Sequence, residues 1–203
     1  MRVAIMGSGG IGGPLGASLA QARDDVTFIA RGAHLDAIRR NGFRVEGERG
    51  TIHIHPANAT ANPAEIGVVD LVLFCVKLWD VEAAGEAIRP IVGPDTTVIP
   101  LQNGIDAPER LAAILGPRAV MGGVAMVGGN IAAPGHPADR SDAAHHLWRT
   151  RRRAQPEGPA APRTLPGGRL RRCSRRRHRV GYVGKIQPHG AVQRPVGVDP
   201  PAP

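Results

Sequence analysis

The sequence predicts an α/β protein with a doubly wound parallel sheet over residues 1–134, followed by a basic tail over residues 135–203. Three observations carry this prediction. Strand-like and helical segments alternate along the first part of the chain, which is typical of βαβ units. A glycine-rich turn follows the first strand. After Pro134 the composition changes from one that can bury a core to one that cannot.

The first elements are defined by apolar runs and by the turn residues that end them. We expect strands at 2–6 and 26–30, helices at 11–22 and 33–40, and a hairpin formed by 43–46 and 51–55. The first helix places Ile11, Leu15 and Leu19 on one face. The second ends at Asn41-Gly42, a pair that favours helix termination. The hairpin segments alternate between apolar and polar residues.

The later elements continue the alternation. We expect strands at 68–76, 97–101 and 120–127, and helices at 81–88 and 107–115. Residues 68–76 form a nearly continuous apolar run, as in a parallel strand covered on both faces. Pro90 ends the first of these helices. Strands separated by helices imply right-handed crossovers and one parallel sheet.

Charge and composition differ sharply between the two parts. Residues 1–134 contain 11 Lys and Arg against 13 Asp and Glu, whereas residues 135–203 contain 15 against 4. Leu, Ile, Val and Phe supply 38 of the first 134 residues but only 9 of the last 69, and the tail holds 10 of the 19 prolines. We therefore expect a packed domain followed by a disordered tail rich in Pro, Arg and Gly.

Several protein classes are excluded by simple counts. The two cysteines, Cys75 and Cys173, give neither a disulfide framework nor a zinc site. The histidines show no ligand spacing, so no metal site is expected. The longest apolar stretch, 68–78, contains two charged residues and is far shorter than the roughly 20 residues that span a bilayer. No signal peptide is recognised at the start, so the expected location is the cytoplasm, with no membrane partner.

The glycine turn predicts a dinucleotide-binding site of the Rossmann type. Gly7, Gly9 and Gly12 form the pattern Gly-x-Gly-x-x-Gly directly after the first strand and at the start of the first helix. Gly7 permits a tight turn, Gly9 lets a pyrophosphate approach the backbone, and Gly12 lets helix and strand pack closely. The helix N-terminus supplies N–H groups and a positive dipole end to the phosphates. A glycine-rich turn without a ligand is the alternative.

Arg31 indicates which dinucleotide would bind. An NAD site has an acidic residue at the end of the second strand, where it binds the ribose 2′-hydroxyl. Arg31 occupies that place here, 19 residues after Gly12, and suits the 2′-phosphate of NADP. Asp36 lies inside the following helix and is less well placed. Alternatively, Arg31 is a solvated surface residue.

Two later strand ends are expected to complete the site. Lys77 follows the central apolar strand, and Asn103 follows the next strand. Ligands of open parallel sheets bind at the carboxyl ends of the strands, so both side chains should face the nicotinamide half of the cleft. Alternatively, each is a helix-capping or solvated residue. Trp79, Asp80 and Glu82 are expected to pack against or cap the start of the next helix.

These motifs together resemble those of one enzyme family. The segments that carry the resemblance are Gly-Ser-Gly-Gly-Ile-Gly-Gly at 7–13, Ala-Arg-Gly at 30–32, Phe-Cys-Val-Lys at 74–77, Leu-Gln-Asn-Gly at 101–104 and Gly-Gly-Val-Ala at 122–125. In order and spacing they resemble the N-terminal domain of the ketopantoate reductases (2-dehydropantoate 2-reductases). The resemblance covers residues 1–134 and implies NADPH-dependent reduction of the 2-oxo acid 2-dehydropantoate to pantoate, a step of pantothenate biosynthesis.

The resemblance also assigns site residues. It implies that Gly7, Ser8, Gly9, Gly10, Ile11 and Gly12 hold the pyrophosphate of NADP(H), that Arg31 holds the 2′-phosphate, and that Lys77, Asn103 and Gly128 lie at the nicotinamide end. Asn103 would also contact substrate. In the family the proton donor is a lysine on a helical C-terminal domain, so no catalytic residue is assigned in this chain.

The tail does not resemble that second domain in the translated frame. We interpret it as a frameshifted remnant, which would leave the chain a truncated and impaired enzyme. Read one base on, the codons of 147–157 can encode Phe-Gly-Glu-Leu-Asp-Gly-x-Arg-Ser-Pro-Arg, which resembles the family's domain-linking strand. In the same frame 183–194 can encode Trp-Glu-Lys-Phe-Ser-Leu-Met-Ala-Pro-Phe-Ser-Gly, which resembles the helix with the catalytic lysine.

Three alternatives stay open. The first is another NADP-dependent hydroxyacid or polyol-phosphate dehydrogenase with the same first domain. The second is a non-catalytic dinucleotide-binding protein. The third is a nucleic-acid-binding protein that uses the basic tail, which is disfavoured because the tail lacks interleaved aromatic residues and a recognisable nucleic-acid motif.

Overall fold

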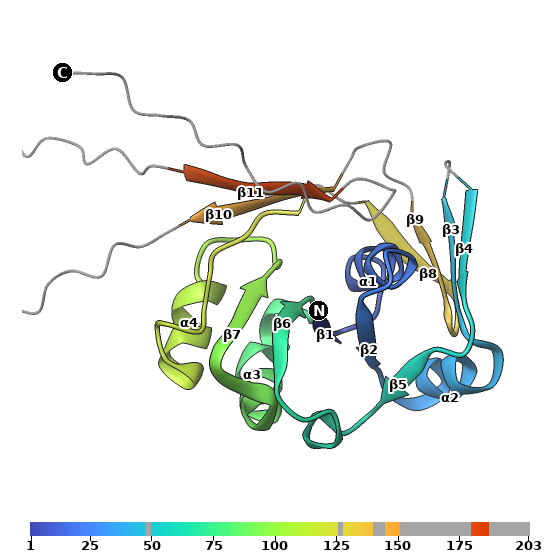
Figure 1. Cartoon of the computed structure of the whole chain (residues 1–203), viewed down its shortest axis with the longest axis horizontal. Helices are drawn as coiled ribbons and strands as arrows, with labels where there is room; N and C mark the ends of the chain where they lie inside the picture. Colours follow the sequence, from blue (N-terminus) through green and yellow to red (C-terminus); the bar gives the residue numbers. More distant parts are fainter. Residues whose placement is uncertain (48–49, 126–127, 140–144, 151–179, 187–203) are drawn as a thin grey trace, which may run out of the picture.

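The computed structural model describes residues 1–47, 50–125, 128–139, 145–150 and 180–186 (Figure 1). The strands of the main sheet are β1 (Arg2–Met6), β2 (Asp25–Ile29), β5 (Asn58–Thr60), β6 (Val69–Phe74) and β7 (Val92–Pro100). The helices are α1 (Gly12–Gln21), α2 (Gly32–Asn41), α3 (Val81–Ala87) and α4 (Ala107–Leu115), with 3₁₀ turns η1 (Pro63–Glu65), η2 (Leu78–Asp80) and η3 (Arg89–Ile91). The remaining strands are β3 (Phe43–Gly47), β4 (Gly50–Ile54), β8 (Gly129–Ala133), β9 (His136–Asp139), β10 (His145–Thr150) and β11 (Val180–Ile186).

The main sheet is parallel and doubly wound, as the sequence predicts. Its strand order is β5-β2-β1-β6-β7, and each neighbouring pair is parallel. Val3 on β1 pairs with Val26 on β2 and with Leu71 on β6, so β1 is the central strand. The chain builds outward from β1 in one direction and then returns to place β6 on its other side. Sheets of this kind bind ligands in a crevice at such a reversal, which falls at the carboxyl end of β1 here.

The two faces of the sheet bury different elements because side chains alternate along each strand. Val3 and Ile5 on β1 face the core that contains Leu15 and Leu19 of α1. Ala4, between them, belongs to the core that contains residues of α3 and α4. Helices therefore cover both faces of the sheet, which explains why the run at 69–74 is apolar nearly throughout.

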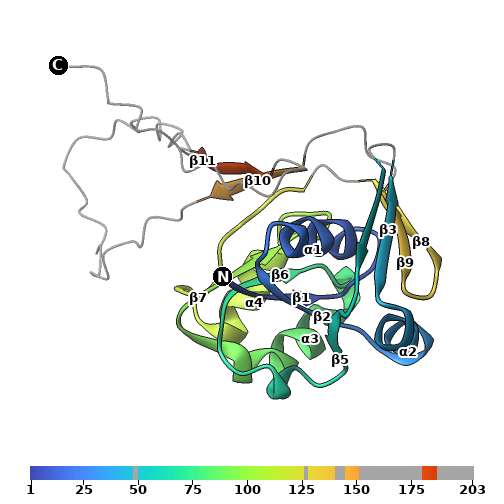
Figure 2. The same cartoon turned by 45° about the vertical axis from the view of Figure 1, so that its right-hand side comes forward.

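A second sheet packs against α1 on the side away from the main sheet, as Figures 1 and 2 show. Its order is β4-β3-β9-β8, and β3–β4 is the expected hairpin. A methyl group added at Gly13 of α1 would lie 2.8 Å from the Pro137 ring and 3.0 Å from Phe43. The ring of Phe43 in turn stacks on Phe28 of the main sheet at a centroid distance of 4.2 Å. The two sheets thus share one core with α1.

The expected strand over 120–127 is wrong for the residues that the structure describes. In the described part of this segment, isolated bridges occur at Val120, which pairs in parallel with Val98, and at Gly122, but no continuous strand forms. Gly122 and Gly123 follow, and glycine weakens a strand because it offers no side chain to pack. Residues 126–127 lie outside the described residues. The next strands along the chain are β8 and β9. They form a hairpin that the sequence did not predict.

The hairpin β8–β9 contains the expected boundary after residue 134, and β9 pairs in parallel with β3. Farther on, β10 and β11 form an antiparallel pair. The rest of the expected tail lies outside the described residues. The prediction that the tail is disordered therefore falls mostly on residues that the structure does not describe. Within the described part of the chain, no helix is both long and apolar enough to cross a membrane.

The stacked Phe28 and Phe43 pair gives a direct test of the shared core. Phe28 is fully buried, so Phe28→Ala removes ring contacts and leaves a cavity between the sheets. We expect the free energy of unfolding to fall by about 3–5 kcal/mol, measured by urea denaturation. The control is Ile105→Ala, because Ile105 is 93% exposed and should change stability little. An equal, small effect of both substitutions would contradict this core assignment.

Candidate functional site

The carboxyl ends of β1, β6 and β7 are held together by backbone hydrogen bonds. The Cys75 N–H donates to the Met6 carbonyl at 2.7 Å, and the Leu101 N–H donates to the Phe74 carbonyl at 3.0 Å. The Gln102 side-chain amide donates to the carbonyls of Phe74 and Val76, both at 3.0 Å. These bonds continue the strand order past the strand ends. They place the glycine turn, the segment at Lys77 and the segment at Asn103 along one edge.

The glycine turn has the close geometry that the motif requires. Gly7 has φ +95°, a left-handed conformation that residues with side chains rarely adopt, and a Cβ added there would lie 3.0 Å from the Cys75 carbonyl. A methyl group at Gly12 would lie 2.2 Å from the Gly7 carbonyl oxygen and 2.8 Å from Ile5 Cγ2. A methyl group at Gly9 would meet only the end of Ile131, at 3.7 Å. The backbone is therefore tightly packed at Gly7 and Gly12 and more open at Gly9.

Helix α1 starts immediately after this turn with an uncapped N-terminus. Ile11 occupies the N-cap position, no side chain caps the helix, and its first turn contains no acidic residue. The Gly13 N–H already donates to the Gly9 carbonyl at 2.8 Å, and Pro14 has no N–H, so an anion here would meet the positive end of the helix dipole and the N–H groups that precede Gly13. This arrangement suits an anion such as a phosphate group.

Two further contacts hold the turn from outside. Ser8 is buried, and its hydroxyl donates to the Ile29 carbonyl at 3.3 Å. Gly10 lies against Gly129 of β8 so closely that a methyl group on Gly10 would come within 2.3 Å of the Gly129 carbonyl oxygen. Gly128, another expected site residue, is exposed and directly precedes this contact. The structure therefore brings the neighbour of Gly128 to the glycine turn.

His34 connects the turn to the second sheet, a role that the sequence analysis missed. Its Nδ1 accepts a hydrogen bond from the Gly135 N–H at 2.9 Å. Nδ1 therefore carries no proton, and Nε2–H of the neutral ring donates to the Ser8 carbonyl at 2.9 Å. The contact spans 101 residues of sequence between His34 and Gly135, so local spacing could not reveal it.

Arg31 occupies the N-cap position of α2, and its side chain extends toward η2. Its side chain is 88% exposed, and its Nη2 lies 3.6 Å from Oδ2 of Asp80 in η2. Asp80 was expected to serve the start of the next helix, and it does occupy the N-cap position of α3, but its side chain makes no capping hydrogen bond. The structure thus brings Arg31 together with a carboxylate that sequence spacing did not connect to it.

The turn that contains Asp80 is anchored by α4. Arg110 binds Glu82 through two hydrogen bonds of 2.6 and 2.7 Å, and its Nη2 donates to the Leu78 carbonyl at 3.0 Å. The hydrogen bonds from Arg110 lower the pKa of the Glu82 carboxyl. Trp79, which was expected to pack at this helix start, is 78% exposed, so that expectation is wrong. Arg110 rather than an aromatic side chain holds the turn.

Lys77 and Asn103 are both exposed at the carboxyl edge. Lys77 precedes the turn that ends at Asp80, whose N–H donates to the Lys77 carbonyl at 2.9 Å. Asn103 follows Gln102, the residue that ties β7 to the end of β6. Both side chains therefore start from fixed backbone next to the crevice.

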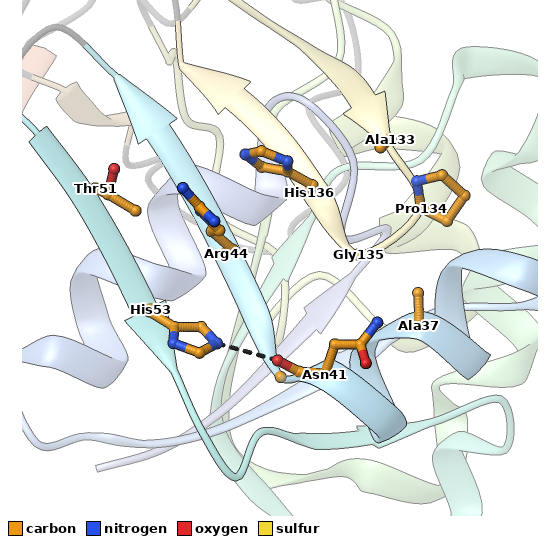
Figure 3. Close-up of a pocket in the computed structure, with 10 residues that line it drawn as sticks. Ala37, Asn41, Arg44, Thr51, His53, Ala133, Pro134, Gly135 and His136 are labelled. Atoms are coloured by element: carbon orange, nitrogen blue, oxygen red, sulfur yellow. Dashed lines mark hydrogen bonds between the residues drawn. The ribbon is translucent and has the colours of Figure 1, made fainter.

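A hollow of about 550 Å³ lies elsewhere, between the end of α2, the β3–β4 hairpin and the β8–β9 turn (Figure 3). None of the expected site residues lines it. Two of its polar side chains are already engaged: Arg44 binds Glu46 at 2.7 Å, and His53 Nε2 contacts the Asn41 carbonyl at 3.0 Å. We therefore assign the candidate site to the carboxyl edge, where the reversal of strand order and the uncapped start of α1 lie together.

Comparison with known proteins adds independent information. Residues 3–145 match the family model described as ketopantoate reductase PanE/ApbA. A 2-dehydropantoate 2-reductase from Mesorhizobium japonicum is 35% identical over 156 residues, which cover 66% of this chain and 48% of the relative. The chain therefore spans about half the length of this relative.

Solved structures give the same result. The crystal structure of a PanE/ApbA family ketopantoate reductase from Ralstonia eutropha is 34% identical, with a TM-score of 0.68 over 72% of this chain and 49% of that one. That of a 2-dehydropantoate 2-reductase from Porphyromonas gingivalis is 40% identical, with a TM-score of 0.65 over 70% of this chain and 52% of that one.

Cys75 offers a test of how tightly the site edge is packed. Burial raises the pKa of its thiol to about 12. Because the thiolate is the reactive form, iodoacetamide at pH 8.5 should alkylate folded Cys75 about three orders of magnitude more slowly than the same residue in urea. The measurement uses a Cys173→Ser variant to isolate one thiol. Equal rates with and without urea would contradict the packing described at the end of β6.

Proposed function

Because the chain belongs to the ketopantoate reductase family of oxidoreductases, we propose that residues 1–134 form its NADPH-binding domain and that the site serves reduction of 2-dehydropantoate to pantoate. The observation that carries this proposal is the glycine turn at the switch point of the sheet, with Gly7 in the left-handed conformation and Gly12 packed against Gly7. The family match supports the substrate class, a small 2-oxo acid.

The pyrophosphate would lie over Gly9 and the uncapped start of α1. Backbone N–H groups of this region and the helix dipole stabilise negative charge without a basic side chain. Ser8 would take part through its main chain, because its hydroxyl already donates to Ile29. Gly10 and Ile11 complete the turn, and the contact of Gly10 with Gly129 fixes its position.

The adenosine ribose would lie beside Arg31, which starts α2 at the end of β2. A guanidinium can bind a 2′-phosphate through paired hydrogen bonds. Arg31 is 88% exposed, so its side chain is accessible to a ligand in the crevice. This supports NADPH as the cofactor.

The nicotinamide end would lie toward the ends of β6 and β7. Lys77 supplies a positive charge there, Asn103 can donate and accept hydrogen bonds, and Gly128 would lie across from them beside the glycine turn. When bound, NADPH would supply the hydride for the ketone carbon. Lys77 and Asn103 would bind and orient the carboxamide or the 2-oxo acid, and Asn103 is proposed to contact both.

The first test is cofactor binding by the purified full chain. We expect NADPH to bind with release of heat in isothermal titration calorimetry, and Gly12→Ala to abolish binding. An added Cβ at Gly12 would lie 2.2 Å from the Gly7 carbonyl oxygen and must displace the turn. The control is Gly116→Ala, because no atom lies within 4 Å of that Cβ, although its φ of +88° costs some stability. Failure of the unaltered chain to bind NADPH would refute the proposal.

The second test concerns catalysis and the origin of the tail. We propose that the tail beyond residue 145, where the family match ends, is a frameshifted remnant of the family's second domain. The chain should then oxidise NADPH in the presence of 2-dehydropantoate no faster than a blank without protein. The nucleotide sequence should also give Trp-Glu-Lys one base on from the codons of 183–185. Normal turnover by the chain as written, or different codons, would overturn this proposal.

A further inference from the structure

The ion pair between Arg31 and Asp80 concerns the choice between NADPH and NADH. It adds a carboxylate that neither the glycine motif nor Arg31 supplies. Arg31 belongs to the β2 side of the sheet and Asp80 to the β6 side, while β1 lies between these strands. The pair therefore spans the carboxyl end of β1, at the crevice where the adenosine ribose of a dinucleotide would lie.

Among the residues that the structure describes, the Asp80 side chain has no structural contact that would explain its position. It occupies the N-cap position of α3 without capping the helix. Arg31 is its ion-pair partner in the described part of the chain, at 3.6 Å. Its side chain is 35% exposed, so it is neither buried in the core nor remote from solvent. The neighbouring turn is held by Arg110 through Glu82 and the Leu78 carbonyl, not by Asp80.

The two groups have opposite effects on the ribose 2′ position. A guanidinium attracts a 2′-phosphate, whereas a carboxylate beside it repels the phosphate and competes for the same N–H donors. A carboxylate can, in contrast, accept a hydrogen bond from a 2′-hydroxyl, as the acidic residue at the end of the second strand does in NAD sites. That residue is absent from the end of β2 here, and Asp80 brings a carboxylate to the same place from the opposite side of β1.

We propose that Asp80 is a specificity-determining residue that lowers the preference of this site for NADPH over NADH by engaging Arg31 and the ribose 2′ group. The inference rests on the proposed function, because it requires a dinucleotide in the crevice. In this arrangement Arg31 favours the phosphorylated cofactor and Asp80 the unphosphorylated one. Their balance, not Arg31 alone, sets the ratio of the two affinities.

The test is isothermal titration calorimetry of NADPH and NADH with the full chain and with Asp80→Asn. This substitution removes the charge and keeps the shape of the side chain. We expect the ratio of the dissociation constants, NADH over NADPH, to rise at least about threefold, because the repulsion of the phosphate and the competition for Arg31 are both removed. Arg31→Gln should lower the same ratio, because it leaves Asp80 without its counterion.

Glu86→Gln is the matched control. It also neutralises one exposed carboxylate that pairs with an arginine, Arg89 at 2.9 Å, but on α3 away from the crevice. The ratio should stay unchanged in this variant. If both cofactors bind and Asp80→Asn leaves the ratio unchanged or lowers it, the role of Asp80 is refuted while the proposed function stands. If neither cofactor binds the unaltered chain, both fail together.

Discussion

The close packing of helix α1 between two sheets is the constraint on which the rest of the structure depends. Gly12 and Gly13, at the start of the helix, leave no room for a side chain toward β1 on one side and toward Phe43 and Pro137 on the other. The same residues end the turn that precedes the helix. A sequence that satisfies this packing therefore also fixes the backbone of the turn, so the stability of the core and the geometry of the proposed anion site have one origin.

From this packing, a network of backbone contacts extends along the edge of the sheet. Backbone hydrogen bonds connect the ends of three strands, from Cys75 to Met6 and from Leu101 to Phe74. The Gln102 side chain adds two more. On the other side, His34 ties the glycine turn to the β8–β9 turn. The exposed charged and hydrogen-bonding side chains of Lys77, Asn103 and Arg31 are thus attached to backbone that these contacts hold in place. A site of this kind is preorganised for a ligand that reaches across several strands.

The sequence predicted the parallel sheet and the glycine turn because both depend on local patterns. The alternation of strands and helices and the apolar run before Lys77 were sufficient to predict the sheet. The spacing of Gly7, Gly9 and Gly12 was sufficient to predict the turn. The contacts that tie distant segments were not predictable in this way. The pairing of β9 with β3, the link from His34 to Gly135 and the ion pair of Arg31 with Asp80 join residues far apart in sequence. The false strand at 120–127 shows the converse: an apolar pattern was present, but its glycines offered no side chains to pack.

The proposed dinucleotide would lie along the carboxyl edge from Arg31 across the glycine turn toward Lys77 and Asn103. Backbone amide NMR shifts of the ¹⁵N-labelled chain, recorded before and after addition of NADPH, test this placement. We expect the largest shift changes at Gly9, Gly10, Arg31 and Lys77, with little change at Asn41 and His53. Shifts concentrated in the hollow beside α2, with none at the glycine turn, would contradict it.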